Sequence, residues 1–297
     1  MSFESLMTKL QGFNTSVEAL AAIGAELRLR CDDLSGDSHS RSLIQDVIQK
    51  IEPGILEGLE ENQERAALAL IQTTLRQAID LLENPARAPG WTNEDPILLQ
   101  SQGQLSRQIV RSIGKIAMDR PDIDFALRQS GSFLDVGTGV GWLAIEAART
   151  WPALRVVGID LCEPALRLAR KNLTGSGVGD RVELRLQSVE QLDDEAVFSL
   201  AWFPGPFIAR ETAARALERV RRALAPGGWV VFGFYTPAPS ELGEALNRLR
   251  AVRSGGHQWT AIEAMDQLRS LGFGLVETVS PSPALLFVLG QRAKAAN

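Results

Sequence analysis

Hydrophobic side chains recur every three or four residues through the first part of the chain, from residue 1 to about residue 84. This is the spacing of one face of an α-helix. One helix is expected to begin near Thr15 and Glu18, whose spacing is typical of a capping box. A second is expected from about Ser42, and a longer one over residues 55–83. No segment here has a convincing strand pattern.

The clearest break in the periodicity is the stretch NPARAPGW at residues 84–91, which is rich in Pro and Gly. Pro and Gly interrupt helices and are common in loops. Helical spacing returns at about residues 103–118. We therefore expect an all-helical N-terminal domain at residues 1–88, followed by linker and lid helices at residues 89–130.

The pattern changes from residue 131 to the end, residue 297, where short β-branched runs alternate with amphipathic helical stretches. The runs are SFLDV, LRVVGID, RVELRL, VFSLAWF, GGWVVFGFY, FGLVETV and ALLFVLG. This alternation predicts an α/β fold with a parallel, doubly wound sheet. Only SPSP separates the last two runs, too little for a crossover helix, so they should pair as an antiparallel hairpin. We predict seven strands in this domain.

Composition argues against several classes of partner. The 297 residues carry a net charge of −5, whereas proteins that bind nucleic acid usually present a basic domain or stripe. The densest basic cluster is interspersed with acidic residues, which is typical of a solvated helix face. It comprises Arg215, Arg219, Arg221 and Arg222, with Glu211 and Glu218 among them. No nucleic-acid partner is expected.

Membrane insertion and metal binding are not expected either. The first residues lack the basic and apolar layout of a signal peptide, and no apolar run reaches the roughly 18 residues of a membrane span. The two cysteines, Cys31 and Cys162, and the two histidines, His39 and His257, have no metal-ligand spacing. We expect a reduced, cytoplasmic protein with no metal.

Three glycines in alternation follow the first predicted strand: Gly137, Gly139 and Gly141. The turn after this strand faces the crevice where open α/β sheets bind ligands, and glycine lets a ligand come close to the backbone. A phosphate-binding P-loop needs Lys and Ser/Thr after the glycines, which are absent. A dinucleotide fingerprint needs a third glycine at the position of Trp142, which makes a nicotinamide dehydrogenase the least favoured interpretation.

A cofactor that carries an amine and no phosphate fits the charges better. Asp135 precedes the glycines, and its carboxylate would repel a pyrophosphate. Asp160 ends the next strand, at the spacing of a carboxylate that accepts hydrogen bonds from an adenosine ribose. S-adenosylmethionine has both an adenosine and an amino-acid tail.

These residues carry a family resemblance. Asp135 to Gly141, together with Gly158-Ile-Asp160, resembles the first two motifs of the class I S-adenosylmethionine-dependent methyltransferases. ALAPGGWVVFG at residues 223–233 resembles the family's turn into the fifth strand. GGHQWTAIEAMDQLRSLGF and the two strands after it resemble the end of the small-molecule branch. The resemblance covers about residues 130–291.

The resemblance implies that S-adenosylmethionine is the cofactor. Residues of the glycine turn would face its methionine portion, Asp160 its ribose and Leu161 its adenine. Ser188 stands where the family often has an acid, and Glu190 is a substitute for that acid. The cofactor-binding residues expected are Asp135, Gly137, Gly139, Gly141, Asp160, Leu161, Ser188 and Val189.

The fourth strand ends in an aromatic stretch without the Asn/Asp-Pro-Pro-Tyr motif found in many methyltransferases of amino groups. Trp202, Phe203 and Phe207 suit an apolar or aromatic small-molecule substrate, although each also suits core packing. Trp91 is the expected anchor of a lid over residues 90–106, with inter-domain packing as its alternative role.

Methyl transfer is a direct displacement that needs a base only where the nucleophile must lose a proton. His257 is the first candidate base and Tyr235 a weaker one. His257 also fits a solvated or structural loop residue, and a reaction without a base stays open.

We therefore predict a methyltransferase that modifies an oxygen or carbon of an apolar or aromatic small molecule, in a biosynthetic role. Two alternatives stay open: an enzyme of this fold that binds S-adenosylmethionine without transferring methyl, and a protein methyltransferase whose N-terminal helices bind the partner. Those helices would otherwise pair two copies into a homodimer or extend the substrate pocket.

Overall fold

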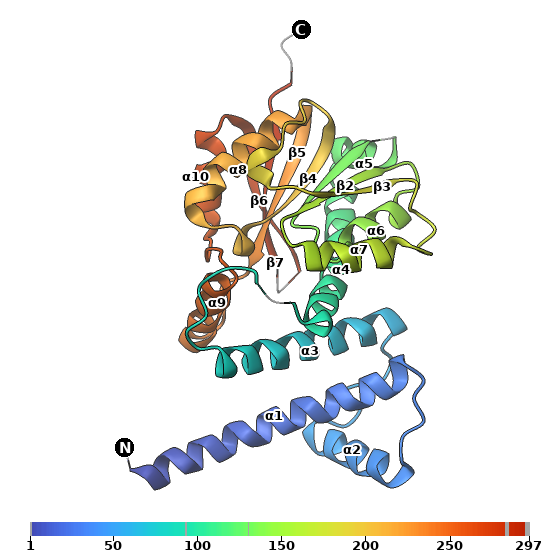
Figure 1. Cartoon of the computed structure of the whole chain (residues 1–297), viewed down its shortest axis with the longest axis vertical. Coiled ribbons are helices and arrows are strands. Elements are labelled where there is room, and N and C mark those ends of the chain that lie inside the picture. The colour runs from blue at the N-terminus through green and yellow to red at the C-terminus, as the bar shows by residue number, and fades with distance from the viewer. Residues whose placement is uncertain (1, 93, 130, 283–284, 295–297) are drawn as a thin grey trace. The chain divides into compact units, whose positions relative to one another are not determined.

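The computed structural model describes residues 2–92, 94–129, 131–282 and 285–294. The chain separates into two compact units, Met1–Pro85 and Ala86–Asn297 (Figure 1). The first unit is helical and the second contains the sheet, as expected.

The first unit consists of α1 (Phe3–Cys31), α2 (Ser38–Ile51) and α3 (Glu61–Glu83). Its small core is formed by Leu27, Ile48, Leu56 and Ile71. A buried carboxylate also joins these helices: Glu26 of α1 is 1% exposed. It accepts hydrogen bonds from Arg30 (3.0 Å) and from Arg41 of α2 (3.2 Å), while Arg30 also pairs with Glu64 of α3.

Two of the expected helix starts are wrong. The residues Thr15 and Glu18 lie inside α1, and the N-cap is Ser2, whose hydroxyl accepts from the Ser5 amide at 3.2 Å. The third helix begins at Glu61 rather than near residue 55, because Glu60 and Gln63 form a capping box there.

The second unit contains a seven-stranded sheet in the order β3-β2-β1-β4-β5-β7-β6. Its strands are β1 (Ser132–Val136), β2 (Arg155–Asp160), β3 (Val182–Leu186), β4 (Phe198–Pro204), β5 (Leu224–Tyr235), β6 (Phe273–Ser282) and β7 (Leu285–Arg292). Strands β1 to β5 pair in parallel, and β7 is antiparallel to both β5 and β6. The predicted fold class is thus confirmed. Residues 283–284 of the expected hairpin turn lie outside the described residues.

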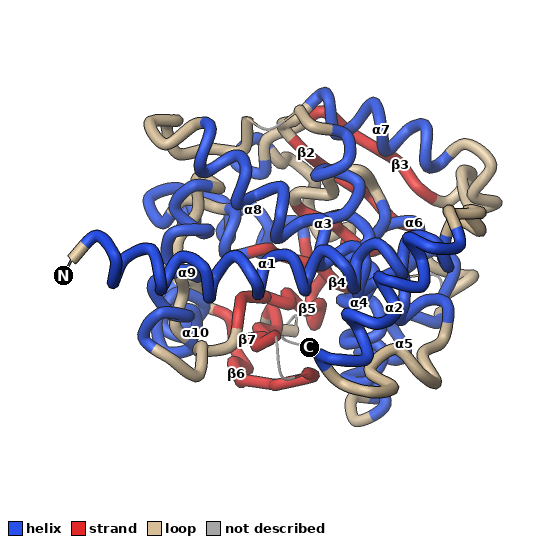
Figure 2. The backbone as a smooth tube through the Cα atoms, turned by 90° about the horizontal axis from the view of Figure 1, so that it is seen from below, coloured by secondary structure: helices blue, strands red, loops and turns tan. Residues whose placement is uncertain are grey.

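Helices cover both faces of this sheet (Figure 2). They are α4 (Pro96–Met118), α5 (Pro121–Arg128), α6 (Trp142–Thr150), α7 (Glu163–Leu173), α8 (Arg210–Ala223), α9 (Glu241–Arg253) and α10 (Ala261–Ser270), with short 3-10 turns η1 (Val189–Gln191) and η2 (Gly205–Phe207). Adjacent residues of β1 show the alternation: Phe133 belongs to one hydrophobic cluster and Leu134 to the other.

The helices α4 and α5 differ from the expected linker and lid. In the second half of α4, Val110 and Ile113 are buried. Together with Ile123 and Leu127 of α5, they belong to the same hydrophobic cluster as residues of α6. These side chains have at most 1% of their surface exposed. Leu98 and Leu99 in the first half of α4 are at most 4% exposed as well. Both helices are therefore built into the second unit, and only the loop before Pro96 remains a candidate lid.

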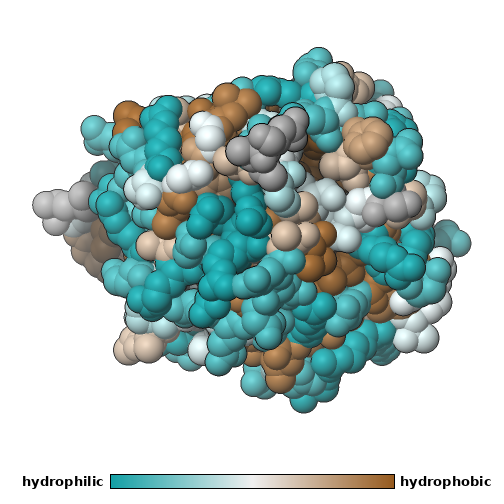
Figure 3. Space-filling view, turned by 90° about the horizontal axis from the view of Figure 1, so that it is seen from above, coloured by the Kyte–Doolittle hydropathy of each residue, from teal (hydrophilic) through white to brown (hydrophobic). Residues whose placement is uncertain are grey.

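The surface seen in Figure 3 is mostly hydrophilic, with small hydrophobic patches scattered over it. Single exposed apolar residues of this kind are ordinary on a globular protein. Among the described helices, none has an apolar stretch long enough to cross a membrane.

Candidate active site

The glycine turn between β1 and α6 has three left-handed residues. Gly137, Gly139 and Gly141 have φ angles of 68°, 56° and 79°, a conformation that residues with a side chain rarely adopt. Their surroundings differ. A Cβ on Gly139 would meet no atom closer than 3.9 Å, whereas one on Gly141 would lie 3.2 Å from Ala169 of α7. The backbone is thus open to a ligand at Gly139, while Gly141 caps α6 and packs against α7.

Asp160 holds this turn to the end of β2. One carboxylate oxygen accepts from the Gly139 amide at 2.7 Å, and the other accepts from the Cys162 amide at 2.8 Å. Burial raises the pKa of Asp160, and these amides oppose that shift. The Leu161 amide bonds the same carboxylate. A carboxylate has about four acceptor positions, so one remains for a hydroxyl group of a ligand.

Asp135 lies beneath the turn, not on its open face. Its side chain is 1% exposed and accepts a hydrogen bond from the Thr138 hydroxyl at 2.7 Å. Burial raises the pKa of Asp135 to about 7, and the nearby charge of Asp160 adds to the shift. The expectation that Asp135 itself faces a ligand is corrected: because β1 is central and covered on both sides, its carboxylate supports the turn through Thr138.

The ends of β2 and β3 present two apolar side chains to solvent. Leu161 is 71% exposed and Leu186 is 56% exposed. Their backbones lie at the same end of adjacent strands, because Leu186 is the register partner of Asp160, the residue before Leu161. Leu161 was expected at the adenine, but Leu186 was missed, although its place at the last position of a predicted strand was a usable signal. We refer to these two exposed leucines at the strand ends as the apolar shelf.

The residues expected to contact the adenine ring lie beside this shelf. Ser188 caps η1, its hydroxyl accepting from the Glu190 amide at 3.2 Å, and Val189 is partly buried. Glu190 is paired with Arg215 of α8 at 2.8 Å. This ion pair occupies the Glu190 carboxylate, which the sequence suggests as a substitute for the family's acid.

Two of the three aromatic residues expected to line a substrate pocket are core residues. Trp202 is 6% exposed and packs against Phe287, while Phe203 has no exposed surface and packs against Phe232. Successive side chains of β4 point to opposite faces, and both faces are covered. This corrects the substrate-lining expectation for Trp202 and Phe203.

The third aromatic residue, Phe207, is 40% exposed and meets Trp91 edge to face, with ring centroids 5.9 Å apart. The segment that carries Trp91 is fixed to the end of α9. The Gly90 amide donates to the Arg253 carbonyl at 3.2 Å, and Arg87 donates to the Gly90 carbonyl at 2.8 Å. The fold thus brings together two residues far apart in sequence.

His257 follows a glycine pair, Gly255 and Gly256, that packs against Gly90 and η2. A Cβ on Gly256 would lie 1.9 Å from the Pro206 carbonyl oxygen. The imidazole Nε2 lies 3.6 Å from the Glu263 carboxylate and 3.5 Å from the Arg210 guanidinium. The ring therefore lies between an acidic and a basic side chain.

Tyr235 is a poor candidate for a base. Its ring lies at the end of β5 with 39% of the residue exposed, but burial around the hydroxyl raises its pKa. At neutral pH it therefore stays a neutral phenol.

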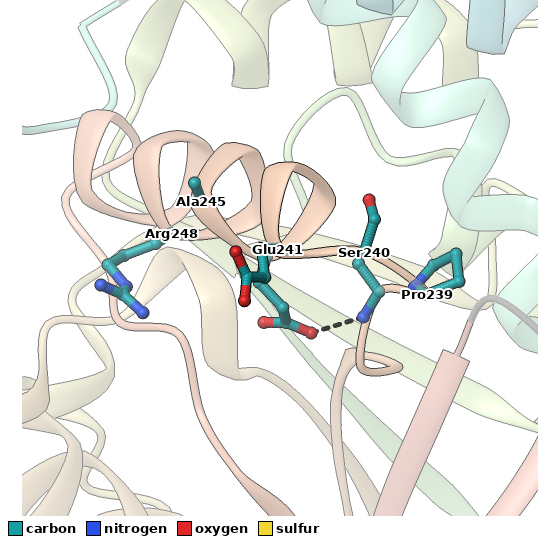
Figure 4. A pocket seen from close by; sticks show the side chains of 7 residues that line it. Pro239, Ser240, Glu241, Ala245 and Arg248 are labelled. Atoms are coloured by element: carbon teal, nitrogen blue, oxygen red, sulfur yellow. Dashed lines mark hydrogen bonds between the residues drawn. The ribbon is translucent and has the colours of Figure 1, made fainter.

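A shallow groove of about 530 Å³ lies at the start of α9 (Figure 4). Within it the Glu244 carboxylate accepts from the Ala238 amide, and it also accepts from the Gln258 amide group. The groove is lined by Ala238, Pro239, Ser240, Glu241, Glu244, Ala245 and Arg248. Its lining combines apolar side chains with the Glu241 and Glu244 carboxylates and the Arg248 guanidinium.

The residues at the strand ends suit S-adenosylmethionine. The open backbone at Gly139, the free acceptor position of Asp160 and the apolar shelf offer one complementary surface for each part of that molecule. Among the described residues no cluster of His, Cys, Asp or Glu could hold a metal ion.

Comparison with known proteins identifies this part of the chain. Residues 133–228 match the family described as a methyltransferase domain. The chain therefore contains a methyltransferase domain in this region. The matched region includes the glycine turn and Asp160 and ends at the start of β5.

Curated relatives match only part of the chain. The ribosomal protein L11 methyltransferase of Geobacter sp. (strain M21) is 33% identical over 128 residues, which are 41% of this chain and 38% of that protein. A ubiquinone/menaquinone biosynthesis C-methyltransferase of Geobacter sulfurreducens is 33% identical over 115 residues, 37% of this chain and 44% of that protein. The chain thus spans about two fifths of the length of the curated relatives it matches.

Solved methyltransferases resemble the chain over its whole length. An O-methyltransferase family protein from Burkholderia thailandensis has a TM-score of 0.66 at 13% identity and covers 100% of both chains. Human N-acetylserotonin methyltransferase, solved with S-adenosylmethionine, has a TM-score of 0.63 at 14% identity and covers 99% of this chain and 100% of its own. At such identities the likeness shows the fold of the methyltransferase domain and of the helices before it.

Proposed function

We propose that this protein transfers the methyl group of S-adenosylmethionine to an oxygen or carbon of an apolar or aromatic small molecule. The observation that carries the proposal is the arrangement at one edge of the sheet. The open glycine turn and the leucine shelf lie at the ends of β1 to β3, and the aromatic pair Trp91–Phe207 adjoins the end of β4.

The roles proposed for the cofactor side follow from the contacts. The Gly137 and Gly139 backbone approaches the methionine portion, and Asp160 accepts from a ribose hydroxyl while holding the Gly139 amide. Leu161 and Leu186 cover the faces of the adenine, which removes their apolar surface from water. When bound, S-adenosylmethionine supplies a methyl group on a positively charged sulfur.

The substrate side is proposed at Phe207 and Trp91. Edge-to-face aromatic pairs present both a ring face and a ring edge, which suits a flat ring system. Each of these residues also has the aromatic character common in small-molecule pockets.

His257 is the proposed base for a hydroxyl substrate. The loop that carries it packs on Pro206, next to Phe207, and its Nε2 lies 3.6 Å from the Glu263 carboxylate. The base takes the proton that a hydroxyl group loses as its oxygen becomes the nucleophile.

A structural relative named for a small-molecule substrate supports the proposal that this protein also acts on a small molecule. The mitomycin 7-O-methyltransferase has a TM-score of 0.62 at 13% identity and covers 97% of this chain and 98% of its own. The curated relatives include enzymes named for a ribosomal protein and for a quinone pathway, so they do not select a substrate by themselves.

We also propose that a second copy of the chain covers the first half of α1. Apolar residues follow one another there at helical spacing, from Phe3 through Leu10 and Phe13 to Val17, and each is at least 45% exposed. A symmetric pairing would bury the same stripe of both copies.

Calorimetric titration with S-adenosylhomocysteine, with NADH as the control ligand, tests the cofactor. Micromolar binding of the first alone supports the proposal, and binding of neither contradicts it. A screen of phenols and apolar hydroxy compounds with methyl-labelled S-adenosylmethionine then tests the reaction. Labelled product together with S-adenosylhomocysteine means methyl transfer, whereas product at unchanged cofactor means a non-methylating enzyme.

A further inference from the structure

The glycine turn is held by side chains as well as by its own hydrogen bonds. Val140, at the centre of the turn, has its carbonyl bonded by the Asn172 amide of α7 at 2.9 Å. Asn172 and Gln100 of α4 bond each other in both directions, at 3.0 and 3.1 Å. The Gln100 carbonyl oxygen also accepts from the Trp142 indole at 2.7 Å.

We propose that Gln100 is a positioning residue for the cofactor-binding turn, an inference that rests on the proposed cofactor. Its amide joins three elements that surround the turn: α4, the first residue of α6 and the end of α7. Gln100 touches no atom that reacts. It acts on cofactor affinity by fixing where the Val140 carbonyl and the neighbouring Gly139 amide lie.

The side chains around the Gln100–Asn172 amide pair, which we call the clamp, are closely packed. A Cβ on Gly103, one turn along α4, would lie 2.2 Å from the Val140 side chain and 2.9 Å from the Trp142 ring. Arg107 lies over the same ring at 5.6 Å and is held by Glu146 at 2.7 Å. These contacts hold the indole in the orientation in which its N–H donates to Gln100.

The clamp also explains why tryptophan stands at position 142. A dinucleotide-binding turn has glycine at this place so that helix and strand can approach closely. Here the large indole fills the space between α4 and α6 and supplies the donor that Gln100 accepts. Trp142, which argues against a dinucleotide-binding turn, thus helps to hold this turn through its hydrogen bond to Gln100.

The same first half of α4 reaches toward the aromatic pair. Leu99 and Val140 are buried in one cluster, with Trp91 and Trp142 packed against it, and Trp91 meets Phe207. A turn displaced from its place would also loosen this cluster. Gln100 therefore connects the proposed cofactor side to the segment that carries Trp91.

The test compares Gln100→Met with Gln108→Met in the full-length protein. Methionine keeps the length of the side chain and removes its hydrogen bonds, and Gln108 is a control on the same helix, bonded to Arg111. We expect Gln100→Met to weaken S-adenosylhomocysteine binding about tenfold, since it loses three hydrogen bonds each worth a modest net amount. The Gln108→Met variant should bind within twofold of wild type.

Amide hydrogen exchange separates positioning from general destabilisation. In the free Gln100→Met protein, the amides of residues 137–141 should exchange faster while those of β4 and β5 stay as in wild type. Trp142→Phe keeps a ring and loses the donor, so it should show the same two effects if Gln100→Met does not fold. The double variant should bind no more weakly than the weaker single variant, because both remove one interaction.

Unchanged affinity and unchanged exchange of the turn in both variants would overturn the inference. A wild-type protein that binds no S-adenosylhomocysteine would overturn the proposed function instead. In that case the exchange measurement on the free proteins still decides whether Gln100 holds the turn.

Discussion

The indole of Trp91 meets the ring of Phe207 edge to face, with centroids 5.9 Å apart and an interplanar angle of 87°. Trp91 lies in the loop before α4 and Phe207 in the 3-10 turn after β4, more than 100 residues later in the chain. The contact depends on Gly90, whose amide bonds the Arg253 carbonyl at the end of α9. Three separate segments of the second unit meet here.

This contact gives a prediction for the substrate side. Phe207→Ala should raise the KM for the methyl acceptor about tenfold, because an aromatic contact and its buried area are lost. The affinity for S-adenosylhomocysteine should not change. Steady-state kinetics with the acceptor found in the screen measures this, and Phe125→Ala, at a phenylalanine 67% exposed on α5, is the control. A tenfold loss of cofactor affinity in Phe207→Ala would contradict the assignment.

Asp160 should matter for the cofactor. Asp160→Asn removes a charged acceptor from the Gly139 amide and from the proposed ribose contact, so binding of S-adenosylhomocysteine should weaken by about 1–3 kcal/mol. Asp193→Asn, at an exposed position, serves as the matched control in the same titration. Equal affinity in the two variants would exclude Asp160 from the cofactor site.

Asp135 should make stability fall as the pH rises. Burial raises its pKa to about 7 in the folded protein, whereas an unfolded chain has a value near 3.9. Between these values the folded state binds the proton and the unfolded state does not, so unfolding becomes easier from about pH 4 to pH 7. Melting temperatures of wild type and Asp135→Asn should diverge over this range, with the variant losing less. Parallel curves would show that Asp135 ionises normally.

Glu26 should stabilise the N-terminal unit. Burial raises its pKa, but hydrogen bonds from Arg41 and Arg30 outweigh that effect and hold the pKa below its usual value. The stabilisation is therefore present above about pH 4.5 and is lost as the pH falls through the lowered pKa. At neutral pH Glu26→Gln should cost roughly 1–3 kcal/mol of unfolding free energy, since the arginines are partly exposed. In denaturant melts Glu61→Gln, whose carboxylate is 76% exposed, should stay within about 0.5 kcal/mol of wild type.

The exposed stripe of α1 gives a prediction about assembly. Leu10 and Phe13 are 45% and 64% exposed, and a double change to glutamate would place charges in an apolar contact between two copies. Light scattering after gel filtration should show a dimer for wild type and a monomer for the variant. A monomeric wild type would leave this stripe without the proposed partner.

The sequence by itself determined the fold class, the seven strands and the turn that follows β1. These are local signals: β-branched runs, helical spacing and three glycines at the end of a strand act within a few residues of one another. It also excluded a P-loop and a dinucleotide turn, because the identity of residue 142 decides both. Helix starts were less certain, since capping residues occur inside helices as well, as Thr15 and Glu18 do in α1.

Only the tertiary structure decided which side chains are available at the site. Trp202, Phe203 and Phe207 are alike in sequence, yet the first two are buried because β4 is covered on both faces, and only Phe207 follows the strand into solvent. Asp135 and Asp160 are both acids at strand ends, but one is enclosed under Thr138 and the other reaches the open turn. The Gln100–Asn172–Trp142 network joins residues from three helices. Pairings between distant segments depend on how the helices pack, and no local pattern specifies that packing.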